Sequence, residues 1–267
     1  MSAGFDRDAA LASPLYSALH PVLGRLPAAR FPSIEDLNAC IDGEPLSGGG
    51  ARIRFVAPFA QSKAFEDRYE VRVYRDGTIP TRAGDLHDLF NALVWLSFPR
   101  TKAGINRLHH QQMLARRGDR LRGPVRDALT LFDESGVIVA CADPSLSSLL
   151  KAFQWKALFW DRREEVRRSM RFFVFGHAIH EKALEPYLEL TAKALVIEVD
   201  SGLAAAAPQA QLALLDERAE HWLSQSAQPR STRDLLPLPL MGVPGWRAQN
   251  AVFYDNAAVF RPARRTG

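Results

Sequence analysis

Residues 86–106 read LHDLFNALVWLSFPRTKAGIN, and the rest of the chain is interpreted around this stretch. Its first part, up to Phe98, is almost entirely apolar and predicts a helix that is buried on every side. Three strongly polar residues, His87, Asp88 and Asn91, stand near the start of that helix. Because buried polar side chains need hydrogen-bond partners, the three form either an internal polar network or part of a functional site.

The segments on either side of this helix predict a mixture of helices and strands. Pro99 ends the helix, and a second helix is expected to follow it. Upstream, residues 69–74 (YEVRVY) alternate in polarity as a strand does, and Asp76-Gly77 predicts a hairpin turn after them. Downstream, residues 128–141 predict a second hairpin.

Hairpins and helices that follow one another in no strict order are typical of the α+β class. We therefore expect a single domain in which antiparallel β-hairpins pack against several helices. Residues 1–50 are predicted to be a helical lead-in packed on the domain, and residues 51–262 form the domain itself. Residues 263–267 are predicted to be a basic C-terminal tail.

Composition favours a globular protein in a reducing compartment. Hydrophobic residues make up 47% of the 267 residues and charged residues 24%, which is ordinary for such a protein. The longest apolar run is about half of the ~20 residues that span a bilayer, and the first residues lack the pattern of a secretory signal. Cys40 and Cys141 follow no metal-binding or redox spacing. We expect a cytoplasmic location and no membrane segment.

The polar residues of the apolar helix are the first candidate site. His87 and Asn91 are four residues apart and therefore share one helix face. In a functional interpretation, His87, Asp88 and Asn91 are catalytic, with His87 as an acid–base group. Arg82 or Arg100 would then neutralise an anionic substrate. In the alternative interpretation, Asp88 or its neighbour caps the helix and the other two satisfy backbone groups.

A second candidate site lies in the sequence GHAIHEK, which follows a predicted strand. His177, His180 and Glu181 are spaced so that all three can project from one side of a helix. Imidazole and carboxylate groups are plausible ligands of a divalent metal, and His177 is also a candidate catalytic residue. The spacing differs from HExxH, and solvated side chains at these positions are the alternative. Asp133 or Glu134 could supply a carboxylate that orients an imidazole.

A basic stretch suggests a different function. Arginines predominate between Arg100 and Arg126, where Asp119 is the only acidic residue. Such a run can bind the phosphate backbone of a nucleic acid, although it lacks the interleaved aromatic residues that would stack on bases. A solvated basic face is the alternative interpretation.

Several separate blocks of sequence resemble a known family. They are YEVRVYRDGTIPTR, LHDLFNALVWLSFPRTKAGIN, RDALTLFDESG, FGHAIHEK and the pair PLPLMGVPGW and FYDNAAVFRP. Together these blocks resemble a bacterial family known as domain of unknown function 3025, and the resemblance runs from about Arg52 to Pro262. It implies a bacterial source and one family domain, and it implies no activity or catalytic residue.

The sequence therefore leads to three functional hypotheses. The first is a cytoplasmic hydrolase-type enzyme, with or without a divalent metal, and it expects His87 and His177 to converge in one pocket. The second is a non-catalytic nucleic-acid-binding protein, which expects the arginines on one continuous face. The third is a partner-binding scaffold with an exposed apolar patch along residues 235–246.

Overall fold

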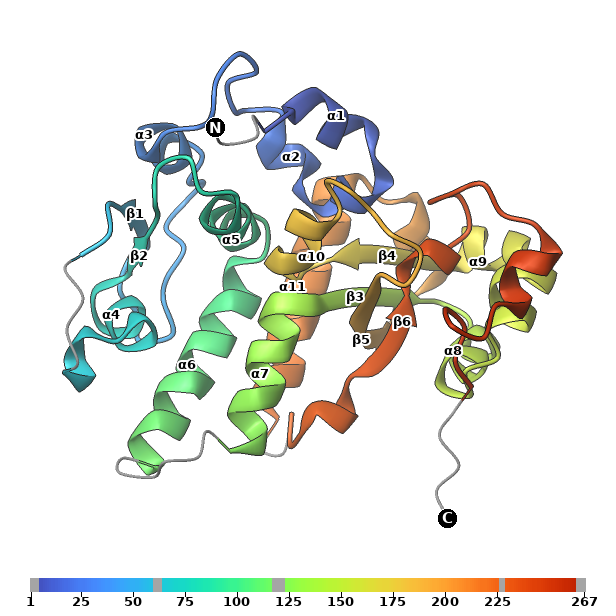
Figure 1. Ribbon diagram of the computed structural model, residues 1–267. Coiled ribbons are helices and arrows are strands. Elements are labelled where there is room, and N and C mark those ends of the chain that lie inside the picture. The colour runs from blue at the N-terminus through green and yellow to red at the C-terminus, as the bar shows by residue number, and fades with distance from the viewer. Residues whose placement is uncertain (1–4, 60–63, 117–122, 226–228, 263–267) are drawn as a thin grey trace.

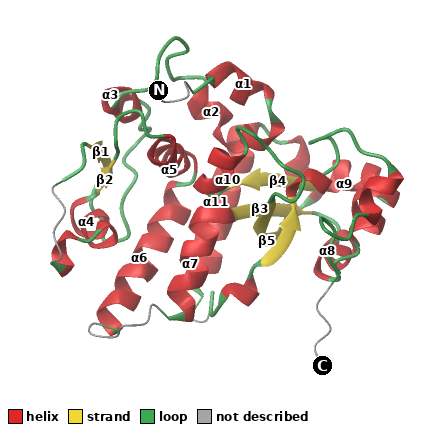
Figure 2. Cartoon of the chain, viewed as in Figure 1, coloured by secondary structure: helices red, strands yellow, loops and turns green. Residues whose placement is uncertain are grey.

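The computed structural model of the chain describes residues 5–59, 64–116, 123–225 and 229–262, and helices dominate it (Figures 1 and 2). The helices are α1 (Arg7–Ala12), α2 (His20–Leu23), α3 (Ile34–Ala39), α4 (Tyr69–Asp76), α5 (Leu86–Ser97), α6 (Pro99–Ala115), α7 (Pro124–Ser135), α8 (Pro144–Lys151), α9 (Arg163–Ser169), α10 (His177–Lys182) and α11 (Pro208–Ser224). The strands are β1 (Arg54–Val56), β2 (Thr78–Pro80), β3 (Gly136–Cys141), β4 (Met170–Val174), β5 (Thr191–Glu198) and β6 (Leu236–Pro239). The α+β class is confirmed.

The larger sheet has the strand order β4-β3-β5-β6. β3 pairs antiparallel with β4 and parallel with β5, and β5 pairs antiparallel with β6. Every residue of β3 is buried, because this strand has neighbours on both edges and helices α7 and α11 contact it. Figure 1 shows α6 and α7 side by side, with this sheet on one side of them and α4, β1 and β2 on the other.

The apolar helix predicted from the sequence is confirmed as α5. Asp85 is its N-cap, and the Asp85 carboxylate accepts a hydrogen bond from the N–H of Asp88 at 3.0 Å. Pro99 begins α6 directly after the break at Phe98. Because α5 packs against α10, the polar residues of its first turn face a segment about 90 residues further along the chain.

The hairpin predicted at residues 69–80 is wrong, because the YEVRVY segment forms α4. Helix α4 packs against α6 and β2, which buries both Val71 and Val73. Tertiary packing here outweighs the preference of valine for strands. Gly77, expected in a hairpin turn, instead ends the helix with a φ of +66°, and β2 pairs in parallel with β1.

The hairpin predicted at residues 128–141 is also wrong in its first half. Only the second half is a strand, β3, and the first half belongs to α7. Val125, Ala128, Leu129 and Phe132 face the core at the spacing of a helix, and Pro124 stands at the first helical position. The wider apolar periodicity therefore decides the conformation of this segment.

One hydrophobic core extends from the lead-in to residues near the C-terminus. Leu19 and Leu23 of the lead-in are fully buried in the same cluster as Leu93 of α5 and Phe175 after β4. The predicted tail, residues 263–267, lies outside the described residues. Within the described ranges, no helix is both long and apolar enough to cross a membrane.

Candidate metal centre

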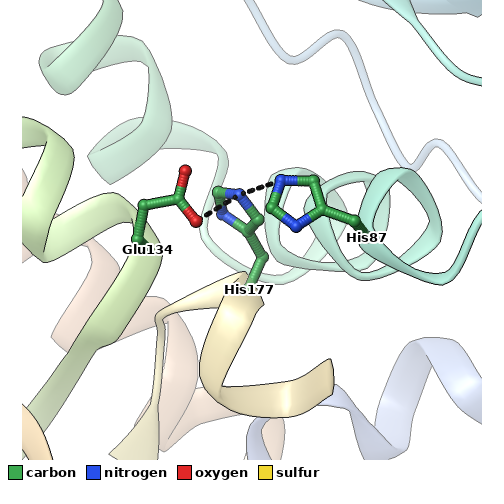
Figure 3. Close-up of side chains that lie close together, drawn as sticks. All are labelled: His87, Glu134 and His177. Carbon is green, nitrogen blue, oxygen red and sulfur yellow. Dashed lines mark hydrogen bonds and ion pairs between the residues drawn. The ribbon is translucent and has the colours of Figure 1, made fainter. Parts of the chain in front are cut away.

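Three side chains from three separate helices meet at one point (Figure 3). His87 comes from the first turn of α5, Glu134 from the end of α7 and His177 from the start of α10. The Nε2 atoms of the two histidines are 3.1 Å apart, and His177 Nε2 lies 3.3 Å from Glu134 Oε2. One ligand atom from each residue fits within 4.8 Å of the other two.

A glycine allows this convergence. Gly176 joins β4 to α10, and its N–H donates a hydrogen bond to the carbonyl oxygen of Gly136 at 2.8 Å. A Cβ at Gly176 would lie 2.5 Å from backbone atoms of Glu134, Ser135 and Gly136. Only glycine allows the end of α7 and the start of α10 to approach so closely, and this approach puts Glu134 beside His177.

A second carboxylate supports the outer side of His87. Glu181 Oε2 lies 3.2 Å from His87 Nδ1. If Nδ1 carries the proton and donates to this carboxylate, His87 Nε2 presents a lone pair toward His177. The Glu134 carboxylate presents lone pairs toward the same nitrogen of His177. Two electron-pair donors thus face one imidazole nitrogen, an arrangement that requires a proton or a metal ion between them.

A buried polar chain lies next to this centre. Lys102 of α6 is only 3% exposed, and its Nζ donates to Asp133 Oδ1 at 2.6 Å and to Asn91 Oδ1 at 2.8 Å. The Asn91 amide nitrogen in turn donates to the hydroxyl oxygen of Tyr69 at 3.1 Å. Asp133 and Glu134 are adjacent in α7, so the polar chain and the metal-type cluster share one wall.

Both groups of residues line a single open cleft of about 610 Å³. Its walls come from α4, α5, α6, α7 and α10, and the lining residues include His87, Asn91, Lys102, Glu134 and His177. A cleft of this size lined by converging polar groups fits a small-molecule site.

The carboxylates of the cleft are charged at neutral pH. Burial is the largest single effect and raises the pKa of Glu134, but the interactions with His177 and His87 together leave the pKa below its ordinary value. Burial likewise raises the pKa of Asp133, but Lys102 together with His177 and His109 leaves that pKa below its ordinary value. The cleft therefore holds negative charge that favours a cation at the histidine pair.

The structure brings His87 and His177 together, as the enzyme hypothesis expects, and it places the other predicted residues differently. Asp88 accepts hydrogen bonds from the backbone N–H, Nε and Nη2 of Arg82, each at 2.8 Å. Both residues line the cleft, but each is occupied by the other. Arg100 lies in the first turn of α6, where its N–H donates to Asp216 Oδ2, and it is not among the described residues of the cleft wall.

His180 faces away from the cleft. Its ring stacks against Tyr16 and Phe90, with ring centres 5.4 and 5.8 Å away, and the residue is fully buried. Burial lowers the pKa of His180 to about 3, so the ring is neutral. Of the three ligands predicted from the sequence, His177 belongs to the cluster, Glu181 bonds to the outer side of His87, and His180 lies in the core.

The nucleic-acid hypothesis needs free arginines and the scaffold hypothesis needs an exposed apolar patch, and the structure pairs some of these arginines with carboxylates and buries most of the patch. Arg107 pairs with Glu220 of α11 at 3.1 Å, and Arg100 lies 3.7 Å from Glu217 of the same helix. The arginines at positions 117, 120 and 122 lie outside the described residues. Residues 235–246, expected as an exposed patch, are mostly buried around β6.

Tyr69 and Lys102 were not singled out from the sequence as site residues. Tyr69 falls in the segment predicted as a strand, and Lys102 lies within the basic stretch between Arg100 and Arg126. The sequence does contain a signal for Lys102. This lysine lies between apolar positions of the helix that follows Pro99, directly after the buried apolar helix. Glu134 was considered only as a group that orients a histidine.

Comparison with known proteins gives one match. A family model described as "Protein of unknown function (DUF3025)" matches residues 53–264. The match covers most of the chain and confirms the resemblance found in the sequence. Searches among curated proteins and among solved structures give no match. The function must therefore be argued from the site.

Proposed function

The chain belongs to the DUF3025 family, and we propose that it is a metal-dependent hydrolase whose divalent ion is bound by His87, Glu134 and His177. The observation that carries this proposal is the convergence of three ligand atoms from three helices. Their separations of 3.1 and 3.3 Å are close to the ~3.3–3.4 Å between ligand atoms of a tetrahedral zinc ion with bonds of about 2.0–2.1 Å. The third separation, between the ligand atoms of His87 and Glu134, is at most 4.8 Å.

The ligand set favours a catalytic ion over a structural one. Structural zinc sites are closed by four protein ligands, whereas catalytic sites hold the ion by three and leave a position for water. Two histidines and one glutamate form such a three-ligand set, and they face an open cleft. An ion bound there would lower the pKa of its water and supply a hydroxide nucleophile at neutral pH.

The surrounding residues suit this chemistry. Glu181 fixes the ring of His87, as carboxylates commonly do for metal-bound histidines. Lys102 and Asp133 place a charge pair beside the centre without occupying it. Hydrolysis needs only water as its second reactant, so the residues of the cleft and the ion suffice for it. The two cysteines are buried and unpaired, which supports the expected cytoplasmic location.

The test is metal binding by tag-free protein. Wild type is compared with His87→Ala, Glu134→Gln and His177→Ala by elemental analysis and by calorimetric titration with Zn²⁺ and Mn²⁺. The control is His221→Ala, because His221 lies on the exposed side of α11 and contacts Gln225. We expect about one ion per chain in wild type and control, and loss of binding in the other three.

Two results would contradict the proposal. Wild type that takes up neither ion, or equal uptake by all variants, would remove the metal centre. Two histidines and a carboxylate also bind Fe²⁺ in oxygenases. Oxygen consumption by iron-loaded protein, with no hydrolysis of esters, amides or phosphoesters by the zinc form, would contradict a hydrolase.

A further inference from the structure

The direction of each hydrogen bond in the buried polar chain is fixed by Lys102. An ammonium group can only donate, so the oxygen of the Asn91 amide must be the atom that faces Lys102 Nζ at 2.8 Å. Asp133 Oδ1 accepts a second hydrogen bond from the same ammonium group at 2.6 Å. The orientation of Asn91 therefore follows from chemistry and not only from the position of its atoms.

The orientation of Asn91 also determines whether the hydroxyl group of Tyr69 donates or accepts in their hydrogen bond. With its oxygen on Lys102, Asn91 must present its NH₂ group to Tyr69, and an amide nitrogen can only donate. The phenol oxygen of Tyr69 accepts this bond, so its own hydrogen has to point elsewhere. Within the described part of the chain, Tyr69 has no acceptor for that hydrogen. Burial raises the pKa of Tyr69 above its ordinary value, which keeps the hydrogen in place at neutral pH.

The direction left to this hydrogen is the cleft. Tyr69 begins α4 and lines the same cleft as His87, Glu134 and His177. Tyr69 is 39% exposed, so its hydroxyl hydrogen can reach a ligand oxygen in the open cleft and donate a hydrogen bond to it. Fixed donors aimed at a developing negative charge are the usual means of stabilising the transition state of acyl transfer.

The charges of the cleft indicate what kind of ligand this is. Each lysine and arginine among the described lining residues is paired with a carboxylate: Arg72 with Asp67, Arg82 with Asp88 and Lys102 with Asp133. No lysine or arginine among the described lining residues is therefore left without a carboxylate to pair with the charge of a phosphate or carboxylate group. A neutral oxygen acceptor suits the cleft better.

We propose that Tyr69 donates a hydrogen bond to the carbonyl oxygen of an uncharged acyl substrate, an ester or amide, at the metal centre. This inference rests on the proposed function. In the reaction, water adds its hydroxyl to the acyl carbon, the acyl C–O or C–N bond breaks, and the leaving group takes the proton. Asn91 and Lys102 are positioning residues, because they act through Tyr69.

The first test compares Tyr69→Phe with Tyr74→Phe in zinc-loaded protein. Tyr74 lies on the same helix, where its ring stacks on His110, and it does not line the cleft among the described residues. For p-nitrophenyl acetate we expect kcat/KM to fall about a hundredfold in Tyr69→Phe. We expect Tyr74→Phe to match wild type, and zinc affinity to be unchanged in both.

The second test reverses the direction of the hydrogen bond between residue 91 and Tyr69. Asn91→Asp keeps the shape of the side chain, but its carboxylate can only accept hydrogen bonds. It accepts from Lys102 and also from Tyr69, whose hydrogen then turns away from the cleft. We expect a fall in kcat/KM comparable to that of Tyr69→Phe, although the tyrosine is intact. Binding of acetohydroxamate to the zinc form should weaken about tenfold in both variants.

The outcomes separate the two proposals. If wild type binds zinc but Tyr69→Phe retains full ester hydrolysis and acetohydroxamate binding, the role of Tyr69 is overturned and the metal centre stands. A wild-type preference for bis(p-nitrophenyl) phosphate over the ester would overturn the acyl substrate class. Wild type that binds no zinc would overturn the proposed function, and this inference with it.

Discussion

The two faces of α10 carry the same residue type in opposite surroundings. His177 faces the cleft, where His87 and Glu134 lie 3.1 and 3.3 Å from its Nε2. His180, three residues later, faces the core between Tyr16 and Phe90. Another histidine and a carboxylate surround His177, whereas aromatic rings surround His180.

This difference shows how one short helix separates chemistry from packing. On the core side, the Tyr16 hydroxyl donates to the carbonyl oxygen of His180 at 2.8 Å and attaches α10 to the lead-in. On the cleft side, Glu181 attaches the same helix to His87 of α5. His180 thus serves to position the helix, and His177 is the residue available to a ligand.

The largest expected effect distinguishes the two histidines directly. Because loss of an outer hydrogen-bond partner already weakens metal affinity 10–100-fold, loss of a ligand should weaken it by more than about a hundredfold. We expect this for His177→Ala in zinc titrations. We expect His180→Phe, which keeps an aromatic ring in the core, to bind zinc as wild type does. If His180→Phe lost zinc and His177→Ala kept it, the ligand set proposed here would be wrong.

The next largest effect concerns the glycine that lets the cleft face form. In Gly176→Ala the new Cβ would press on backbone atoms of Glu134, Ser135 and Gly136 at 2.5 Å. Backbone cannot move aside as a flexible side chain can, so we expect a loss of about 1–3 kcal/mol in the free energy of unfolding. Zinc affinity should fall as well, because Glu134 and His177 separate.

Urea unfolding and zinc titration measure both effects of Gly176→Ala. The matched control is Gly202→Ala, since a Cβ at Gly202 would meet nothing within 4 Å. That control should unfold like wild type. A Gly176→Ala protein with unchanged stability and zinc affinity would show that the close approach does not position the site.

The sequence predicts the helices better than the strands. Residues 86–97 are long, apolar and capped by Asp85, so their helix is predictable from local signals. The segment at residues 69–74 carries a strand-like alternation, yet α6 and β2 bury two of its valines in a helix. Packing partners distant in the chain make that choice, and a local pattern does not contain them.

The sequence points to some individual residues of the candidate site, but it does not predict how they come together. His87 and His177 attract notice as polar groups near apolar elements, but the sequence does not say that they meet. The spacing of His177 and His180 suggests one shared side of a helix, whereas α10 is so short that its two ends face different neighbours. Glu134 enters the site through the contact of two chain segments at Gly176, which no local motif records.

A smaller effect is expected on the cleft side of α10 at Glu181. Glu181→Gln keeps an oxygen that can accept from His87 Nδ1 but removes its charge, and charge-assisted bonds are roughly twice as strong as neutral ones. We expect zinc affinity to fall about tenfold. The control is Glu185→Gln, because Glu185 is exposed beyond the end of α10. Equal zinc affinity in the two variants would mean that Glu181 does not orient the ligand.

The last expected effect concerns the core side of α10 and the pH dependence of stability. Burial lowers the pKa of His180 from an ordinary value of 6.5 to about 3. In the unfolded chain the ring takes up a proton below pH 6.5, while in the folded protein it stays neutral. Stability contributed by the neutral ring is therefore present above pH 6.5 and is lost as the pH falls toward 3, by up to about 1.4 kcal/mol per pH unit.

His180→Phe removes this titration and should flatten the curve of unfolding free energy between pH 7 and pH 5. Urea unfolding of wild type and variant at several pH values measures the difference between their slopes. All other titrating groups are common to both proteins, so their contributions cancel in that difference. Parallel curves would show that His180 is protonated in the folded state, and the contrast between the two faces of α10 would then lose its electrostatic basis.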